Sequence, residues 1–142
     1  MLLKQNKWIT NACSFLLILL FVYTGTSKLL GNQQFREQLS QVSYLKTMAE
    51  PLSICLPVLE LITGLAIAYK PTQSYGLYAA AILMTLFAGY VALMLLSDRT
   101  KLPCSCGGVI KAMSWKQHLY FNIFFMLLAW FTIKLRASEK RE

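Results

Sequence analysis

The sequence predicts an all-α fold, an integral membrane four-helix bundle with an interfacial amphipathic helix between spans one and two, and two observations predict it. Hydrophobic residues make up 56% of the 142 residues and charged residues only 14%, whereas soluble domains are about 45–50% apolar and about 25% charged. In addition, four apolar stretches approach or exceed the roughly 20 residues that a helix needs to cross a bilayer. The expected spans cover residues 8–30, 51–69, 75–96 and 114–135.

The four spans account for more than half of the chain, and what remains is too short for a separate soluble domain. We therefore expect residues 1–142 to form a single membrane domain that is surrounded by lipid. The first span is expected to be an uncleaved signal anchor, because its apolar run continues to about Leu30 and no small-residue cleavage site follows it.

The connector between the first two spans, residues 32–49, has a helical pattern but is too polar to cross a membrane. Phe35, Leu39, Val42 and Leu45 recur at spacings of four, three and three residues, with polar residues between them. This pattern predicts an amphipathic helix that lies along the membrane interface, over one end of the bundle.

Local signals predict how one span starts and how several of them pack. Ser114, with Gln117 three residues later, forms the capping-box pattern that starts a helix at the fourth span. Gly25, Gly64 and Gly89 are small residues within spans, and we expect them to permit close contact between helices.

The net charge of +8 comes from basic residues at span ends and in connectors. Residues placed in this way contact anionic lipid head groups, so we do not expect the chain to bind nucleic acid. Four spans put both termini on one side of the membrane, and they put residues 32–49 and a loop at residues 97–113 on the other. Lys and Arg are denser in the short terminal segments, which favours a cytoplasmic terminal side. The charged tail, residues 136–142, is expected to fray.

The loop at residues 97–113 holds the main candidates for chemistry, Cys104 and Cys106, within the segment Pro-Cys-Ser-Cys-Gly-Gly. An extended pair at this spacing is near the upper limit of about 6.8 Å between the Cα atoms of a disulfide, so closing the ring requires the bend that Pro and Gly allow. So small a ring is expected to be strained, and strained disulfides exchange readily. The helix start that follows and two nearby lysines favour the thiolate, and a water-facing cysteine pair suits an oxidising compartment.

Other interpretations of this loop are a structural disulfide or two inert thiols, although so small a ring would constrain little chain entropy. A metal site would recruit His118, but two thiols and one imidazole lack the fourth ligand of tetrahedral zinc, so we expect no metal. Cys55, near the loop-side start of span two, is either a resolving thiol for the pair or a small buried apolar residue.

Polar residues within the spans are the remaining candidates. Trp115, His118 and Asn122 share one face of span four. His118 could accept or deliver a proton during thiol exchange, or it could form an interhelical hydrogen bond that fixes packing. Glu60 lies deep within span two, where an ionised carboxylate costs about 2.5–3.5 kcal/mol. Lys28 is its expected partner, in a structural ion pair or in a proton relay.

Three motifs combine these residues. They are Tyr-Thr-Gly-Thr-Ser-Lys at residues 23–28, Pro57-x-x-Glu60-x-x-x-Gly64, and the cysteine segment followed by Trp115-x-x-His118-x-x-x-Asn122. Together they resemble the MauE/DoxX family of small four-helix membrane proteins, and the resemblance extends over nearly the whole chain. That family is named for a protein needed to mature methylamine dehydrogenase, and its members are thought to work with a thioredoxin-like partner.

The resemblance implies a bacterial inner-membrane protein with cytoplasmic termini and a periplasmic cysteine loop. Cys104 and Cys106 would exchange a disulfide with a periplasmic thioredoxin-like partner, as a component of a thiol–disulfide oxidoreductase system. From the residues themselves, we expect His118 and Glu60 to assist proton movement, and we expect no cofactor, with a quinone as the open alternative.

Two other functional classes stay open. One is a non-catalytic membrane subunit that acts as a scaffold for a complex. The other is a bundle that binds a quinone or another small molecule, with Tyr90, Trp115 and Phe121 around the pocket. A four-helix redox protein similar to vitamin K epoxide reductase would normally show Cys-x-x-Cys beside a quinone. The Cys-x-Cys spacing here weakens a direct reaction of the cysteines with a quinone and leaves it open.

Overall fold

The computed structural model describes residues 2–97 and 114–141, which are almost entirely helical. In chain order, the elements are α1 (Leu2–Leu30), α2 (Asn32–Ser40), the short 3-10 helix η1 (Lys46–Met48), α3 (Ala49–Ala68), α4 (Gln73–Leu96) and α5 (Trp115–Arg141). The expected all-α four-helix bundle is confirmed, with α1, α3, α4 and α5 as its long helices.

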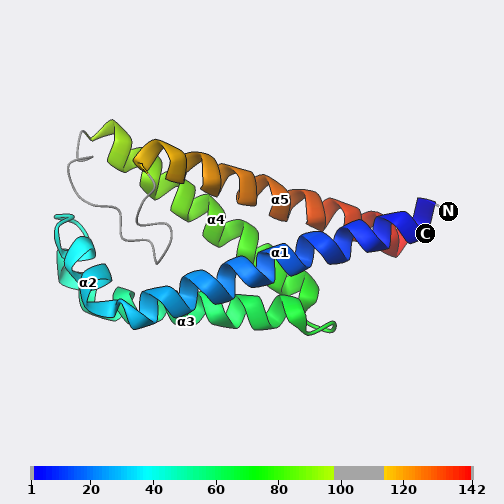
Figure 1. Cartoon of the computed structure of the whole chain (residues 1–142), viewed down its shortest axis with the longest axis horizontal. Helices are drawn as coiled ribbons and strands as arrows, with labels where there is room; N and C mark the ends of the chain where they lie inside the picture. Colours follow the sequence, from blue (N-terminus) through cyan, green and yellow to red (C-terminus); the bar gives the residue numbers. More distant parts are fainter. Residues whose placement is uncertain (1, 98–113, 142) are drawn as a thin grey trace.

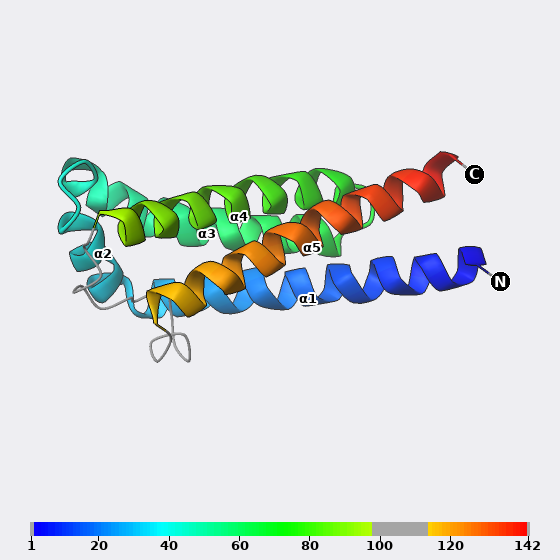
Figure 2. The ribbon, with the colours of Figure 1, turned by 90° about the horizontal axis from the view of Figure 1, so that it is seen from above.

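The four long helices run up and down in turn, so that both termini lie at one end of the bundle and α2 lies at the other (Figures 1 and 2). α1 packs against α3, α3 against α4, α4 against α5, and α5 against α1. The bundle is therefore a ring of helices in chain order. The end of α4 and the start of α5 lie at the same end as α2 (Figure 1), as the even number of spans predicts.

Each of the four long helices is long and apolar enough to cross a membrane. Their outward faces are apolar as well. Leu65, Leu93 and Leu127 are examples, with 66%, 64% and 59% of their surface exposed. Large contiguous apolar surfaces are rare on soluble monomers, whereas lipid solvates them well. The chain is therefore a multi-pass membrane protein whose outer surface contacts lipid.

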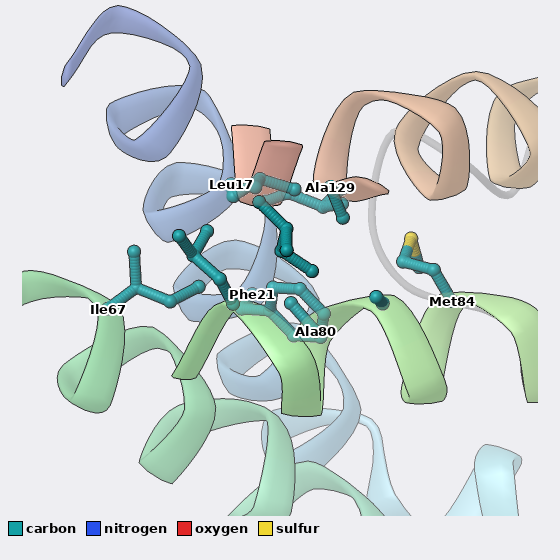
Figure 3. Packing of buried hydrophobic residues seen from close by; sticks show 10 residues of the cluster. Leu17, Phe21, Ile67, Ala80, Met84 and Ala129 are labelled. Carbon is teal, nitrogen blue, oxygen red and sulfur yellow. The ribbon is translucent and has the colours of Figure 1, made fainter. Parts of the chain in front are cut away.

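The main apolar core extends from the middle of the bundle toward the end that holds the termini, and all four long helices contribute to it. Figure 3 labels six of its buried residues, which are Leu17, Phe21, Ile67, Ala80, Met84 and Ala129. Because Ala80 and Ala129 are small, they let the neighbouring backbones come close, and close van der Waals packing is what holds helices together in lipid.

Glycines mark where two helices approach most closely. A Cβ atom on Gly76 would lie 2.6 Å from the backbone nitrogen of Ile67, so the start of α4 fits against the end of α3 only without a side chain. Gly25 and Gly64 join α1 to α3 in the expected way, since their added Cβ atoms would lie 3.0–3.2 Å from side-chain or backbone atoms of the other helix. The expectation for Gly89 was wrong. It faces outward, and no described atom lies within 4 Å of its added Cβ.

The connector helix is shorter than the expected range of 32–49. α2 ends at Ser40, whose hydroxyl donates a hydrogen bond to the carbonyl oxygen of Glu37 (2.6 Å) and so competes with the helical ladder. Turns with i→i+3 hydrogen bonds follow, and then η1. The apolar face is formed as predicted, because Phe35 and Leu39 are buried against the start of α3.

The outer ends of α1 and α5 are longer than expected. α1 begins at Leu2 rather than near residue 8, and α5 continues to Arg141 rather than ending near residue 135. The expectation that the tail frays was wrong for residues 136–141, which are helical and are held by neighbouring helices. Thr10 donates a hydrogen bond to Glu139 (2.8 Å), and Arg136 donates to the side chains of Gln73 and Ser74 at the start of α4.

Candidate functional site

A cavity of about 230 Å³ lies within the bundle toward the end covered by α2. Toward this end, the pair α1 and α3 diverges from the pair α4 and α5 (Figure 1). α2 covers this space and contributes Phe35 and Leu39 to the lining of the cavity. Asn32 connects α2 to α3 by donating a hydrogen bond to the carbonyl oxygen of Ser53 (2.9 Å). Most of the lining is leucine, phenylalanine and other apolar side chains.

A buried ion pair lines this cavity. The Lys28 Nζ atom on α1 lies 2.5 Å from Glu60 Oε1 on α3, and these residues are only 6% and 1% exposed. The ion pair expected from the sequence is thus formed. It offsets the cost of placing each charge within the span, and it leaves the pair with no net charge.

Two aromatic rings complete the surroundings of the lysine. The Lys28 Nζ atom lies 5.6 Å from the ring centre of Phe35 on α2 and 4.6 Å from that of Phe87 on α4. Both distances are within the range of cation–π attraction. The ammonium group therefore links four helices, because Glu60 adds α3 to the contacts of α1, α2 and α4.

The start of α5 brings two more polar side chains to the cavity. The helix begins with the expected capping box, in which the Gln117 side chain accepts a hydrogen bond from the Ser114 N–H (2.9 Å) and the Gln117 N–H donates to the Ser114 hydroxyl (3.3 Å). This start fixes the first turn, and it sets His118 and Asn122 on the inward face. Both line the cavity and are buried, at 5% and 3% exposure.

Three buried polar atoms of the cavity-lining side chains have no hydrogen-bond partner among the described residues. They are Glu60 Oε2, His118 Nδ1 and Asn122 Nδ2. An unpaired buried donor or acceptor costs about 1–3 kcal/mol. A carboxylate oxygen accepts, an amide nitrogen donates and an imidazole nitrogen can do either. The site can therefore bind a small polar group or transfer a proton. The unpaired atoms that allow this lower the stability of the fold.

The other candidate residues lie in different places. Cys104 and Cys106 fall within residues 98–113, outside the described part of the chain. Cys55 is exposed on α3, so its interpretation as a small buried residue was wrong, whereas its role as a resolving thiol stays a prediction. Trp115 is half-buried at the start of α5 and is not among the lining residues of the cavity.

The expected pocket is thus present in part. Tyr90 and Phe121 line the cavity as the small-molecule interpretation predicted, although Trp115 does not. Sequence reasoning missed Phe87, because α4 is apolar on all sides and nothing in its pattern distinguishes one face from another. Among residues 2–97 and 114–141, no group of three or more His, Cys, Asp or Glu residues is placed to hold a metal ion.

Comparison with known proteins gives two matches and one negative result. A family model described as "Methylamine utilisation protein MauE" matches residues 6–135. A protein of Paracoccus denitrificans described as "Methylamine utilization protein MauE" is 30% identical over 107 residues, which are 73% of this chain and 58% of that protein. The chain thus spans little more than half the length of this relative. No solved structure matches.

Proposed function

The chain belongs to the MauE family of methylamine utilisation proteins, and from this premise we propose that it is an inner-membrane component of a thiol–disulfide exchange system. Cys104 and Cys106 are the exchanging pair. The partner is a periplasmic protein of the thioredoxin-like type or its client, and the family name suggests that the pathway serves methylamine utilisation.

The observation that carries this proposal is the position of the buried polar groups relative to the cysteine segment in the chain. Residues 98–113 link α4 to α5, and the ends of both helices lie at the cavity end of the bundle (Figure 1). His118 follows in the first turns of α5, and Glu60 lines the same cavity. His118 and Glu60 can therefore take up or release protons at the end of the bundle where residues 98–113 join α4 to α5.

The proposed exchange proceeds in two steps that conserve electrons. One thiolate of the pair attacks a sulfur of the partner's disulfide, a mixed disulfide forms, and the partner's other sulfur leaves as a thiolate. The second cysteine of the pair then attacks the mixed disulfide, so that the pair is oxidised and the partner is reduced by two electrons. The two protons of the pair are taken up by the two thiolates of the partner, and His118 and Glu60 assist their transfer. The reverse reaction uses the same steps.

Trapping of the mixed disulfide tests this function. Cys104→Ala and Cys106→Ala should each remove one thiol, and the variant that keeps the attacking thiol should hold a partner in a band that dithiothreitol removes on a non-reducing gel. Cys13→Ala is the matched control, because it removes a cysteine toward the opposite end of α1 and keeps both Cys104 and Cys106. The second thiol of the pair then resolves any mixed disulfide, so this variant should trap no partner. If neither single variant traps a partner and the double variant keeps full activity in its host pathway, the chain is instead a non-catalytic scaffold.

A further inference from the structure

The cavity has features of a ligand site that the thiol chemistry does not use. Its polar lining side chains are Thr24, Lys28, Glu60, Tyr90, His118 and Asn122. Three of them matter here, Glu60 on α3 and both His118 and Asn122 on α5. Each of these side chains has one buried atom without a partner among the described residues. A molecule held between α3 and α5 would satisfy these atoms if it could both accept and donate hydrogen bonds.

Charge narrows the class of ligand to a neutral molecule. Lys28 and Glu60 already neutralise each other at 2.5 Å, so the site offers neither sign of charge in excess. The free carboxylate oxygen of Glu60 disfavours an anion such as a fatty-acid head group. The rings of Phe35 and Phe87 already contact the Lys28 ammonium group, so they disfavour binding of a second cation.

The volume and the lining of the cavity further restrict the class of ligand. An apolar cavity of about 150 Å³ is enough to hold benzene, so a cavity of about 230 Å³ accommodates a single substituted ring. The lining of leucine, phenylalanine, methionine and valine side chains favours a flat apolar body. Leu86 lines the cavity while 62% of its surface is exposed, so the cavity borders the lipid-facing surface, which is where an apolar tail would lie.

We infer that the cavity binds the head group of a membrane quinone or its quinol. A quinone oxygen can accept a hydrogen bond from Asn122 Nδ2, and a quinol hydroxyl can donate one to Glu60 Oε2 or His118 Nδ1. A neutral ring with polar atoms at its edges suits a mostly apolar cavity whose unpartnered polar atoms come from both α3 and α5 among the described residues. Quinone binding at Glu60, His118 and Asn122 does not depend on the cysteines.

Binding measurements on the purified full chain in lipid nanodiscs test this inference, with decylubiquinone as the probe. We expect saturable binding of about one molecule per chain above that of empty nanodiscs. Decylbenzene has the same tail and a ring without oxygens, and it should bind at least ten-fold more weakly. Lack of saturable binding, or equal binding of the two probes by the unaltered protein, would overturn the proposal without any variant.

Variants then locate the site. Asn122→Leu removes the donor at nearly constant volume, and Val91→Phe fills the cavity from α4, so each should weaken decylubiquinone binding at least ten-fold. Gly89→Ala on the outer face of α4 is the matched control and should bind as the unaltered protein does. The Cys104→Ala, Cys106→Ala double variant should also keep binding, which separates this result from the disulfide-trapping experiment. Unchanged binding in both cavity variants would show that the quinone binds elsewhere.

Discussion

The same four helices build two different ends of the bundle. Toward the termini, side chains such as Leu17, Phe21 and Ala129 are fully buried and meet in an apolar core (Figure 3). The buried polar residues in this half carry only small hydroxyl groups, as in Thr10, Ser14 and Thr132. Toward α2, the helices diverge around a cavity, and buried positions there hold Lys28 and Asn122 instead. Unpaired buried polar atoms and empty space both reduce stability. The two ends thus differ in packing, because apolar side chains fill the end near the termini, whereas the end near α2 holds a cavity and three of the four buried side-chain atoms without a partner among the described residues.

The largest effect should come from breaking the buried ion pair at the cavity end. Glu60→Gln leaves the Lys28 ammonium without its carboxylate, and removing one partner of a buried pair costs about 3–5 kcal/mol. Thermal unfolding in detergent should show the loss, and adding Lys28→Met should recover much of it. The exposed pair of Arg36 and Glu50, 3.8 Å apart, is the matched control, so Glu50→Gln should cost less than about 1 kcal/mol. Strict additivity of the two buried changes would show that they do not interact.

A second substitution tests the packing at the end of the bundle that holds the termini. Gly76→Ala places a Cβ atom 2.6 Å from the backbone nitrogen of Ile67, so α4 must move away from α3. Overpacking of this kind costs about 1–3 kcal/mol. Gly89→Ala adds the same methyl group on the same helix where no described atom lies within 4 Å, and its unfolding temperature should stay close to that of the unaltered protein. Equal unfolding temperatures for the two variants would contradict the close approach of α3 and α4.

A smaller change should have the opposite sign. Asn122→Leu replaces a buried amide, whose Nδ2 has no partner among the described residues, with an apolar side chain of similar volume. We expect the ligand-free protein to gain about 1 kcal/mol of stability, because an unpaired buried donor is removed. Thermal unfolding of delipidated protein, with Gly89→Ala as the neutral reference, measures the gain. A loss of stability would mean that Asn122 serves packing rather than a ligand.

How far the sequence predicted this structure differs between the two ends. The spans, the capping box at Ser114 and the Lys28–Glu60 pair were predicted, because each depends on the local pattern of one helix or on the cost of a charge in lipid. The contact at Gly76 and the ring of Phe87 over the lysine were not. They depend on how one uniformly apolar helix packs against another, and an apolar helix carries no pattern that identifies its contact face. The roles of the cysteines and of His118 stay predictions.

The proposed thiol chemistry requires that the cavity end of the bundle faces the periplasm and that the packed end faces the cytoplasm. Two variants without Cys13 and Cys55 compare these ends directly. One keeps Cys104 and Cys106, and the other replaces that pair by alanine and carries Ser138→Cys on the exposed face near the end of α5. After mild reduction, intact spheroplasts are treated with a membrane-impermeant maleimide. We expect the first variant to be labelled in intact spheroplasts and the second only after permeabilisation; the reverse pattern would contradict both the orientation and the periplasmic exchange.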